Sequence, residues 1–153
     1  MNVRLAVSCL AMGTILMLSG CASMNDMIAG DPWQAYEGPA QPRNNVAIIK
    51  TSGMRDYFSE AYIFRINDRA VEKIGGYIDT LPGHYTLEVS VTQRLGGPGS
   101  LLGTLSEKRA RGTIDLDAEP GRTYIVDGRV ADGKALLWIE DEKTQQVVAG
   151  TRP

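Results

Sequence analysis

The sequence contains few of the residues on which most catalytic and metal-binding sites depend. It has two cysteines, Cys9 and Cys21, and one histidine, His84, among 153 residues. A single histidine excludes metal sites built from several histidines and leaves one candidate for a serine triad. No G-x-S-x-G element supplies a nucleophile, so we expect an exposed or capping role for His84, no enzymatic activity and no cofactor.

The chain also lacks a strong excess of charge of either sign. It has 16 basic and 18 acidic side chains, for a formal net charge of −2. Proteins that bind nucleic acids usually carry a clear basic excess, because their cations replace the counterions of the phosphates. We therefore expect no nucleic-acid partner.

No apolar run looks long enough for a permanent transmembrane helix. The main run extends from Leu5 to Leu18 and follows one positive charge at Arg4. As a helix rising about 1.5 Å per residue, it would span about 21 Å of a hydrocarbon core that is about 30 Å thick. A basic start, a short apolar run and small residues after it are typical of a secretory signal, so we predict cleavage of residues 1–20. Only Cys21 then remains, and no internal disulfide can form.

Four residues at the end of this signal resemble the lipobox of bacterial lipoproteins: Leu18, Ser19, Gly20 and Cys21. The resemblance implies that the Cys21 thiol receives a diacylglyceryl group and that the preceding peptide bond is cut. Two or three acyl chains then anchor the protein stably, whereas one chain is marginal. No aspartate follows the cysteine directly, which by the same resemblance favours the outer membrane, facing the periplasm. An ordinary secretory signal with an incidental cysteine is the alternative.

Residues 21–44 are mostly small, polar or turn-forming, and we predict that they form a lipidated tether. The bulky side chains in the tether are Trp33 and Tyr36. They could dock on the folded domain, lie among lipid headgroups or contact a partner.

Residues 45–153 are predicted to form one all-β domain. From His84 to Thr92 apolar and polar residues alternate, which indicates an antiparallel strand with one buried face. Turn residues recur about every ten residues, and no span has helical periodicity. We predict an antiparallel β-sandwich of seven to nine short strands. The expected strands are residues 46–50, 61–66, 70–78, 84–92, 102–108, 111–116, 123–131, 135–140 and 146–149.

Two stretches carry a family resemblance. The first contains Trp33, Tyr36 and the Glu-Gly-Pro at 37–39 before the strand at 46–49, and the second contains the Leu-Pro-Gly at 81–83 before the alternating strand. They resemble small, uncharacterised envelope lipoproteins of proteobacteria, and the second, together with the turn at Asn67 and Asp68, is similar to a PEGA-type β-domain. The resemblance implies a surface-associated binding or scaffolding module, and it assigns no functional residues.

Several side chains are candidates for partner contacts. Lys108, Arg109 and Arg111 form a basic cluster that could meet lipopolysaccharide phosphates or peptidoglycan carboxylates, or could protect the edge of a sheet. Leu101 and Leu102 adjoin a glycine-rich loop and could contact a protein.

Acidic residues follow the basic cluster along the chain. Asp115 and Asp117 share one strand face and indicate a solvated acidic edge, with a calcium site as the alternative.

Together these observations predict a membrane-anchored, non-enzymatic envelope module that binds an envelope protein or a glycan. A structural accessory of a larger envelope complex is the alternative. A hydrolase that uses His84 is a third hypothesis, which would need a serine and a carboxylate converging on the histidine in a pocket.

Overall fold

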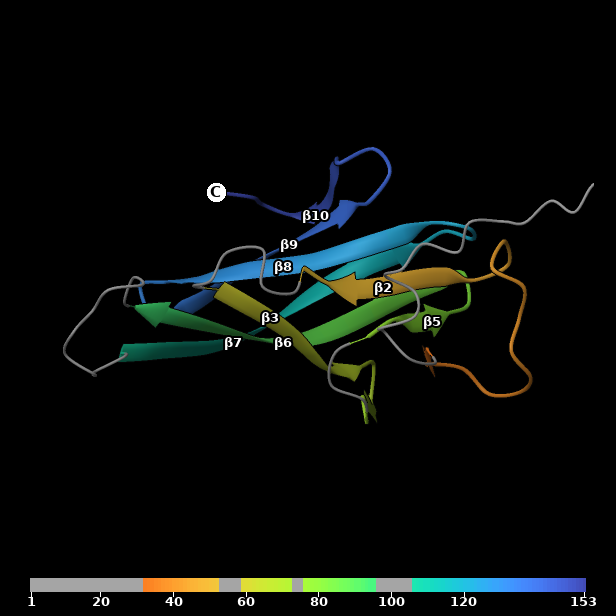
Figure 1. Cartoon of the computed structure of the whole chain (residues 1–153), viewed down its shortest axis with the longest axis horizontal. Helices are drawn as coiled ribbons and strands as arrows, with labels where there is room; N and C mark the ends of the chain where they lie inside the picture. Colours follow the sequence, from red (N-terminus) through yellow and green to blue (C-terminus); the bar gives the residue numbers. More distant parts are fainter. Residues whose placement is uncertain (1–31, 53–58, 73–75, 96–105) are drawn as a thin grey trace, which may run out of the picture.

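The computed structural model describes residues 32–52, 59–72, 76–95 and 106–153. These residues form ten strands in two sheets that face each other across one hydrophobic core (Figure 1). The prediction of an all-β sandwich is confirmed. Among the ten strands, β1 and β4 have only two residues each, which explains why the count exceeds the predicted seven to nine. In the part of the chain that is described there is no helix able to cross a membrane.

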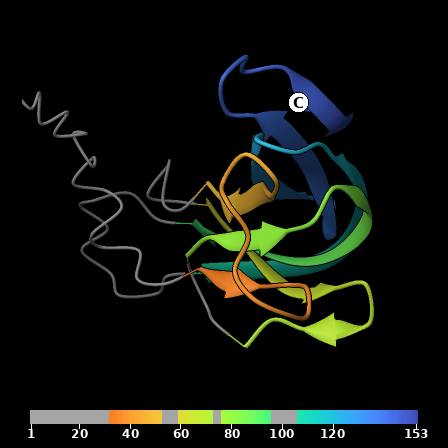
Figure 2. The same ribbon diagram turned by 90° about the vertical axis from the view of Figure 1, so that its right-hand side faces the viewer.

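The larger sheet has the strand order β1-β5-β2-β8-β9-β10. Its strands are β1 (Trp33–Gln34), β5 (Ile78–Thr80), β2 (Ala47–Thr51), β8 (Thr123–Ala131), β9 (Lys134–Asp141) and β10 (Val147–Gly150). The smaller sheet has the order β4-β3-β6-β7. Its strands are β4 (Arg69–Ala70), β3 (Ser59–Ile66), β6 (Gly83–Leu95) and β7 (Ser106–Ala118). Seen after a 90° turn, the blue C-terminal strands lie at the top of the view, and the orange β1 lies in its lower half (Figure 2).

Most strand pairs are antiparallel, as predicted, but two pairs in the larger sheet are parallel. Strand β2 runs parallel to β8, and the short β1 runs parallel to β5. The longest ladder joins β6 to β7 over all thirteen residues of each strand without a register shift. These two strands extend along the molecule in Figure 1.

Alternation along the strands places apolar residues between the sheets. In β6, Leu87, Val89 and Val91 are completely buried, and they face Val126 and Ile139 of the larger sheet in the same core. Each large apolar side chain that is removed from water stabilises the fold by about 1.5–3 kcal/mol. The same alternation leaves the intervening residues of β6 and β7 on the solvent side of the smaller sheet.

The strand predicted at residues 70–78 is wrong in its extent. The structure instead has β4 at Arg69–Ala70 and β5 at Ile78–Thr80, in different sheets, with residues 73–75 outside the described part. Gly76 has φ 133°, a conformation that favours glycine and that a regular strand does not contain. A single strand therefore cannot run through Gly76 to β5.

The two strands predicted at residues 102–108 and 111–116 prove to be one strand, β7, within the described residues. Residues 102–105 lie outside them. The alternation of exposed and buried residues continues through Ala110 and Gly112, and the segment contains no proline or positive-φ residue to interrupt it. Arg109 and Arg111 therefore lie on one continuous strand.

The hairpin predicted at Asp132 and Gly133 is confirmed. Their φ angles are 49° and 74°, as a two-residue turn between β8 and β9 requires.

Part of the predicted tether is incorporated into the fold. Trp33 and Gln34 form β1, and Trp33 packs against the core beneath the guanidinium of Arg69, 5.6 Å from the ring centre. Arg69 also donates a hydrogen bond of 2.9 Å to the carbonyl of Ala35. Docking on the domain, the first of the three roles considered for Trp33, is therefore the one that the structure shows.

Candidate binding face on the smaller sheet

The solvent side of β3, β6 and β7, called here the outer face, carries a shallow groove of about 420 Å³. Three strands contribute its lining: Glu60, Tyr62, Phe64, Ser90, Thr92, Arg109 and Arg111. The set combines aromatic rings, hydroxyl groups, two guanidinium groups and one carboxylate, which is the chemistry of a polar binding surface rather than of a core.

The strand register places these side chains in rows across the sheet. Thr92 of β6 lies opposite both Glu60 of β3 and Arg109 of β7. In the next row, Ser90 lies opposite Tyr62 and Arg111. Side chains directly opposite each other on one face are separated by only about 5 Å at Cβ, so each row forms one continuous patch.

A β-bulge explains why β3 presents two consecutive residues to the outer face. The register of β3 against β6 shifts between Ile63 and Arg65, so Phe64 is the extra residue. Phe64 lines the groove, while Arg65 pairs with Glu88 on the same face at 3.7 Å. Bulges redirect side chains in this way and are common beside functional sites.

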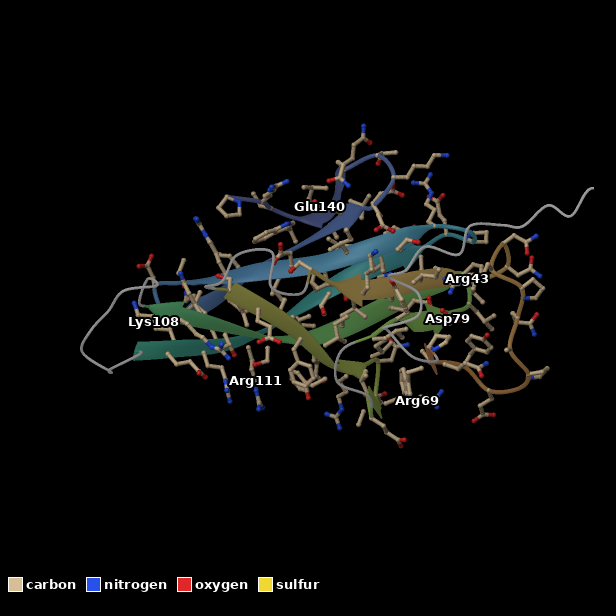
Figure 3. The ribbon with its side chains drawn as sticks, viewed as in Figure 1. Arg43, Arg69, Asp79, Lys108, Arg111 and Glu140 are labelled. Atoms are coloured by element: carbon tan, nitrogen blue, oxygen red, sulfur yellow. The ribbon has the colours of Figure 1, made fainter. Side chains whose placement is uncertain are left out.

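The aromatic and cationic side chains of the groove contact each other directly. The Arg111 guanidinium lies 4.9 Å from the centre of the Phe64 ring, within the range of a cation–π interaction. The Tyr62 ring is 6.4 Å from the Phe64 ring and tilted by 40°. Figure 3 shows Arg111 on the side of the molecule opposite Glu140 of the larger sheet, where it points outward.

The other end of the outer face is acidic. Asp117 lies 2.7 Å from His84, measured from Oδ1 to Nδ1, and Asp115 accepts a hydrogen bond of 2.7 Å from Thr86. The hydrogen bond that Asp117 accepts from the His84 ring raises the pKa of His84 above its ordinary value. From Arg109 to Asp117, the exposed face of β7 therefore changes from cationic to acidic.

Two groups of charged side chains in and beside the larger sheet are paired within the protein. Glu140 is only 1% exposed, and it accepts a hydrogen bond from the Trp138 indole and pairs with Arg152 at 2.9 Å. A second hollow, of about 500 Å³, lies beside Arg122, whose guanidinium is held by Glu119 and Asp141.

A third polar group of the larger sheet lies at the other end of that sheet, near Arg43 (Figure 3). Asp79 is buried there, which raises the pKa of its carboxyl group, and its Oδ1 has no hydrogen-bond partner among the residues that the structure describes.

The structure brings together some of the side chains that the sequence suggested for partner contacts. Arg109 and Arg111 share the groove, whereas Trp33 is docked on the core and Tyr36 accepts a hydrogen bond from the backbone N–H of Gln41 at 3.1 Å. The lipobox residues Leu18, Ser19 and Gly20, the acylation site Cys21, and the pair Leu101 and Leu102 lie outside the described residues.

Tyr62 and Phe64 were missed at the sequence level, although a signal was present. They alternate with Ala61 and Ile63, so a strand that buries Ala61 and Ile63 must turn both rings outward. Two aromatic residues at outward strand positions indicate a contact surface.

The candidate metal ligands do not form a cluster. Over the described ranges, no group of three or more His, Cys, Asp or Glu side chains is placed to hold a metal ion. For Asp115, the structure gives a hydrogen bond with Thr86 and an ion pair with His84 at 4.0 Å.

Comparisons of the chain with protein-family models, curated proteins and solved structures found no match. Function is therefore inferred from the residues and their geometry.

Proposed function

We propose that this chain is a lipid-anchored, non-enzymatic binding module of the bacterial cell envelope, and that it binds an anionic glycan in the groove of the outer face. The observation that carries the proposal is the stacking of Arg111 on Phe64 beside Tyr62 and Arg109. Carboxylate or phosphate groups of the glycan would pair with the guanidinium groups, and a sugar ring would lie against the aromatic side chains.

The geometry of the groove suits an extended polymer. It is open and lies across three strands, so a chain of sugars could pass over it without entering a deep cavity. The cation–π contact with Phe64 keeps the Arg111 guanidinium beside the ring, and the planar group can make bidentate contacts to a carboxylate or phosphate group. The hydroxyl groups of Thr92 and Ser90, in the rows between the aromatic and cationic side chains, can donate to or accept from sugar hydroxyls.

The anchor would hold the groove close to the membrane. In this proposal the lipid is on Cys21, and the fold begins at Trp33 in β1, twelve residues later. An extended chain covers at most about 3.6 Å per residue, so the tether would reach about 40 Å. This distance confines the module to a thin layer next to the membrane, where envelope glycans are concentrated.

The groove is tested by measuring how strongly the full chain, purified in detergent, binds to peptidoglycan sacculi or to lipopolysaccharide vesicles. The sacculi supply carboxylate groups and the vesicles supply phosphate groups, so the two ligands distinguish the two anions. The double variant Arg109→Gln, Arg111→Gln should lose at least about tenfold in binding, because each charge-assisted hydrogen bond contributes about 1.5–3 kcal/mol. The matched control is Arg129→Gln, which removes an exposed arginine from β8 in the other sheet. Equal binding by the double variant and the control would refute the groove.

The anchor is tested separately by mass spectrometry of the protein isolated from its native membranes. The proposal requires a mature chain that starts at Cys21 and carries acyl groups. An uncut or unacylated N-terminus would overturn this half of the proposal and leave the groove to be judged by its own experiment.

A further inference from the structure

We infer that the chain forms a twofold-symmetric homodimer in which strand β7 of one copy pairs antiparallel with β7 of a second copy. The inference goes beyond the proposed function, since it assigns a role to the free edge of the smaller sheet. It depends on the length and regularity of this edge, on the order of the charges along it, and on the register that those charges select.

Strand β7 has the longest outer edge that the described part of the chain leaves unpaired. The edge of β3 is shorter, and β4 covers it only at Arg65 and Ile66. The other edge strands are β1 and β4, with two residues each, and β10, with four residues and a register irregularity. Strand β7 has thirteen residues, contains no proline and shows no bulge against β6. Natural proteins usually shorten, bend or block such an edge, because its unpaired N–H and C=O groups bind other strands.

The charges on β7 do not repel a second copy of the strand. Its exposed side chains include Arg109 and Arg111 in the first half and Asp115 and Asp117 in the second half, with Thr113 between them. Edge strands are protected when charges of one sign repel an identical strand. Here the two halves have opposite signs, so an antiparallel copy meets its complement.

In one register, each of the four charged side chains lies opposite a side chain of opposite charge. If the twofold axis passes through Thr113, Arg109 lies opposite Asp117 of the second copy and Arg111 lies opposite Asp115. Symmetry repeats both pairs, which gives four cross-strand ion pairs on one face. Opposite charges at directly opposed positions stabilise a sheet pair by about 0.2–1 kcal/mol each. The backbone hydrogen bonds supply most of the affinity, and the charges select orientation and register.

The apolar side of the strand fits the same register. Ala110 then lies opposite Leu116 of the second copy, and Gly112 lies opposite Ile114, so apolar residues adjoin apolar residues across the interface. The Arg109, Asp115 and Asp117 side chains are 62%, 63% and 90% exposed, so they are accessible to the second copy.

The one pair of like charges that this register produces lies at the margin of the interface. Glu107 would face Glu119 of the second copy, and Glu119 lies just beyond the end of β7. Each of the two carboxylates already pairs within its own chain at 2.9 Å, Glu107 with Arg109 and Glu119 with Arg122. These pairs reduce the repulsion between them.

Cysteine crosslinking in intact envelopes tests the register directly. Thr113→Cys places two thiols opposite each other on the axis, at a Cα separation of about 4.5–5.5 Å, which a disulfide can bridge. The matched control, Glu60→Cys, is exposed on the same face but two strands from the edge, so its two copies would be separated by about 24 Å across the strands and by a further offset along them. We expect a covalent dimer for Thr113→Cys and none for Glu60→Cys. The unsubstituted chain is a second control, because any dimer that it forms must be linked through Cys9 or Cys21.

Charge reversal in the Thr113→Cys background tests the ion pairs. The acidic variant, Arg109→Glu with Arg111→Glu, and the basic variant, Asp115→Arg with Asp117→Arg, should each fall to the crosslinking level of the Glu60→Cys control. Co-expressed, they should recover a mixed dimer, because every opposed pair is again of opposite sign. Recovery also shows that both variants fold.

Crosslinking at position 113 no greater than at position 60, or undiminished crosslinking of either reversed variant, would overturn the inference. Crosslinking of the Thr113→Cys variant to a different envelope protein in place of a second copy would also overturn it.

Failure of the dimer and failure of the proposed function remain distinguishable. The chain carrying all four reversals keeps opposite charges in every cross-strand pair, so it should form the dimer again. It also moves the positive charges out of the groove, so it should not bind the anionic glycan.

Discussion

The substitution Gly128→Ala is expected to destabilise the protein by overpacking its core. Gly128 is a buried residue of β8, and a methyl group built there would lie 2.8 Å from Leu137 Cδ2 and 2.8 Å from Val91 Cγ2. It would also lie 3.0 Å from the carbonyl oxygen of Leu136. The Leu137 side chain can rotate away, but Val91 is fully buried and β-branched, and the carbonyl belongs to the backbone.

The expected cost follows from these contacts. An inserted methyl group in a packed core typically destabilises by about 1–3 kcal/mol, and two rigid neighbours place Gly128→Ala at about 2–3 kcal/mol. For a domain of about 100 residues, this corresponds to a fall in Tm of about 10 °C or more. Urea unfolding monitored by the fluorescence of the two tryptophans measures the change in the free energy of unfolding.

Comparison with a second glycine, Gly133, separates the cost of steric overlap from the cost of an unfavourable backbone conformation. Gly133 has φ +74°, and a methyl group at this position would have no atom within 4 Å, so Gly133→Ala tests the conformational cost alone, about 1 kcal/mol. A cost for Gly128→Ala no greater than that for Gly133→Ala would refute overpacking as the cause.

Three further results are expected from buried and paired charges. Arg152→Ala should lower the free energy of unfolding, measured by urea titration, by about 1–2 kcal/mol, because the nearly buried Glu140 loses a charged partner. NMR titration of His84 should give a pKa above 6.5 that falls in Asp117→Asn; the associated stability is present below pH 6.5 and lost as the pH rises through the folded-state pKa. Asp79→Asn should raise the urea midpoint at pH 7, since burial raises the pKa of Asp79 and disfavours its ionised form, and this gain should shrink as the pH falls through the folded-state pKa. An unchanged midpoint, an unshifted titration or a gain independent of pH, respectively, would contradict these expectations.

Local alternation accounts for the part of the fold that the sequence predicted correctly. The strand predicted at 123–131 has the observed bounds, and the turn at Asp132 and Gly133 contains the residue types that positive φ favours. These signals are local, because each strand has one buried face and each tight turn constrains its own backbone.

Pairing between distant strands could not be read in the same way. Nothing in residues 47–51 indicates that β2 lies between β5 and β8 or that it runs parallel to β8, since both depend on how the two sheets close around the core. The division of the segment at 70–78 between two sheets has the same origin.

The candidate site was likewise only half visible in the sequence. Arg109 and Arg111 were found because they are close together along one strand. Tyr62 and Phe64 follow from alternation along β3, whereas the bulge that adds Arg65 to the same face depends on the partner strand, so the strand's own sequence does not reveal it.

The parallel pairing of β2 with β8 constrains the order in which the strands can pair as the protein is synthesised. Ile48 pairs with Thr123, so the larger sheet cannot close until most of the polypeptide has been synthesised. The β6–β7 hairpin joins neighbouring segments and can form earlier, because closing a short loop costs less entropy than closing a long one. Strand β2 therefore lacks its parallel partner until residues 123–131 have been synthesised.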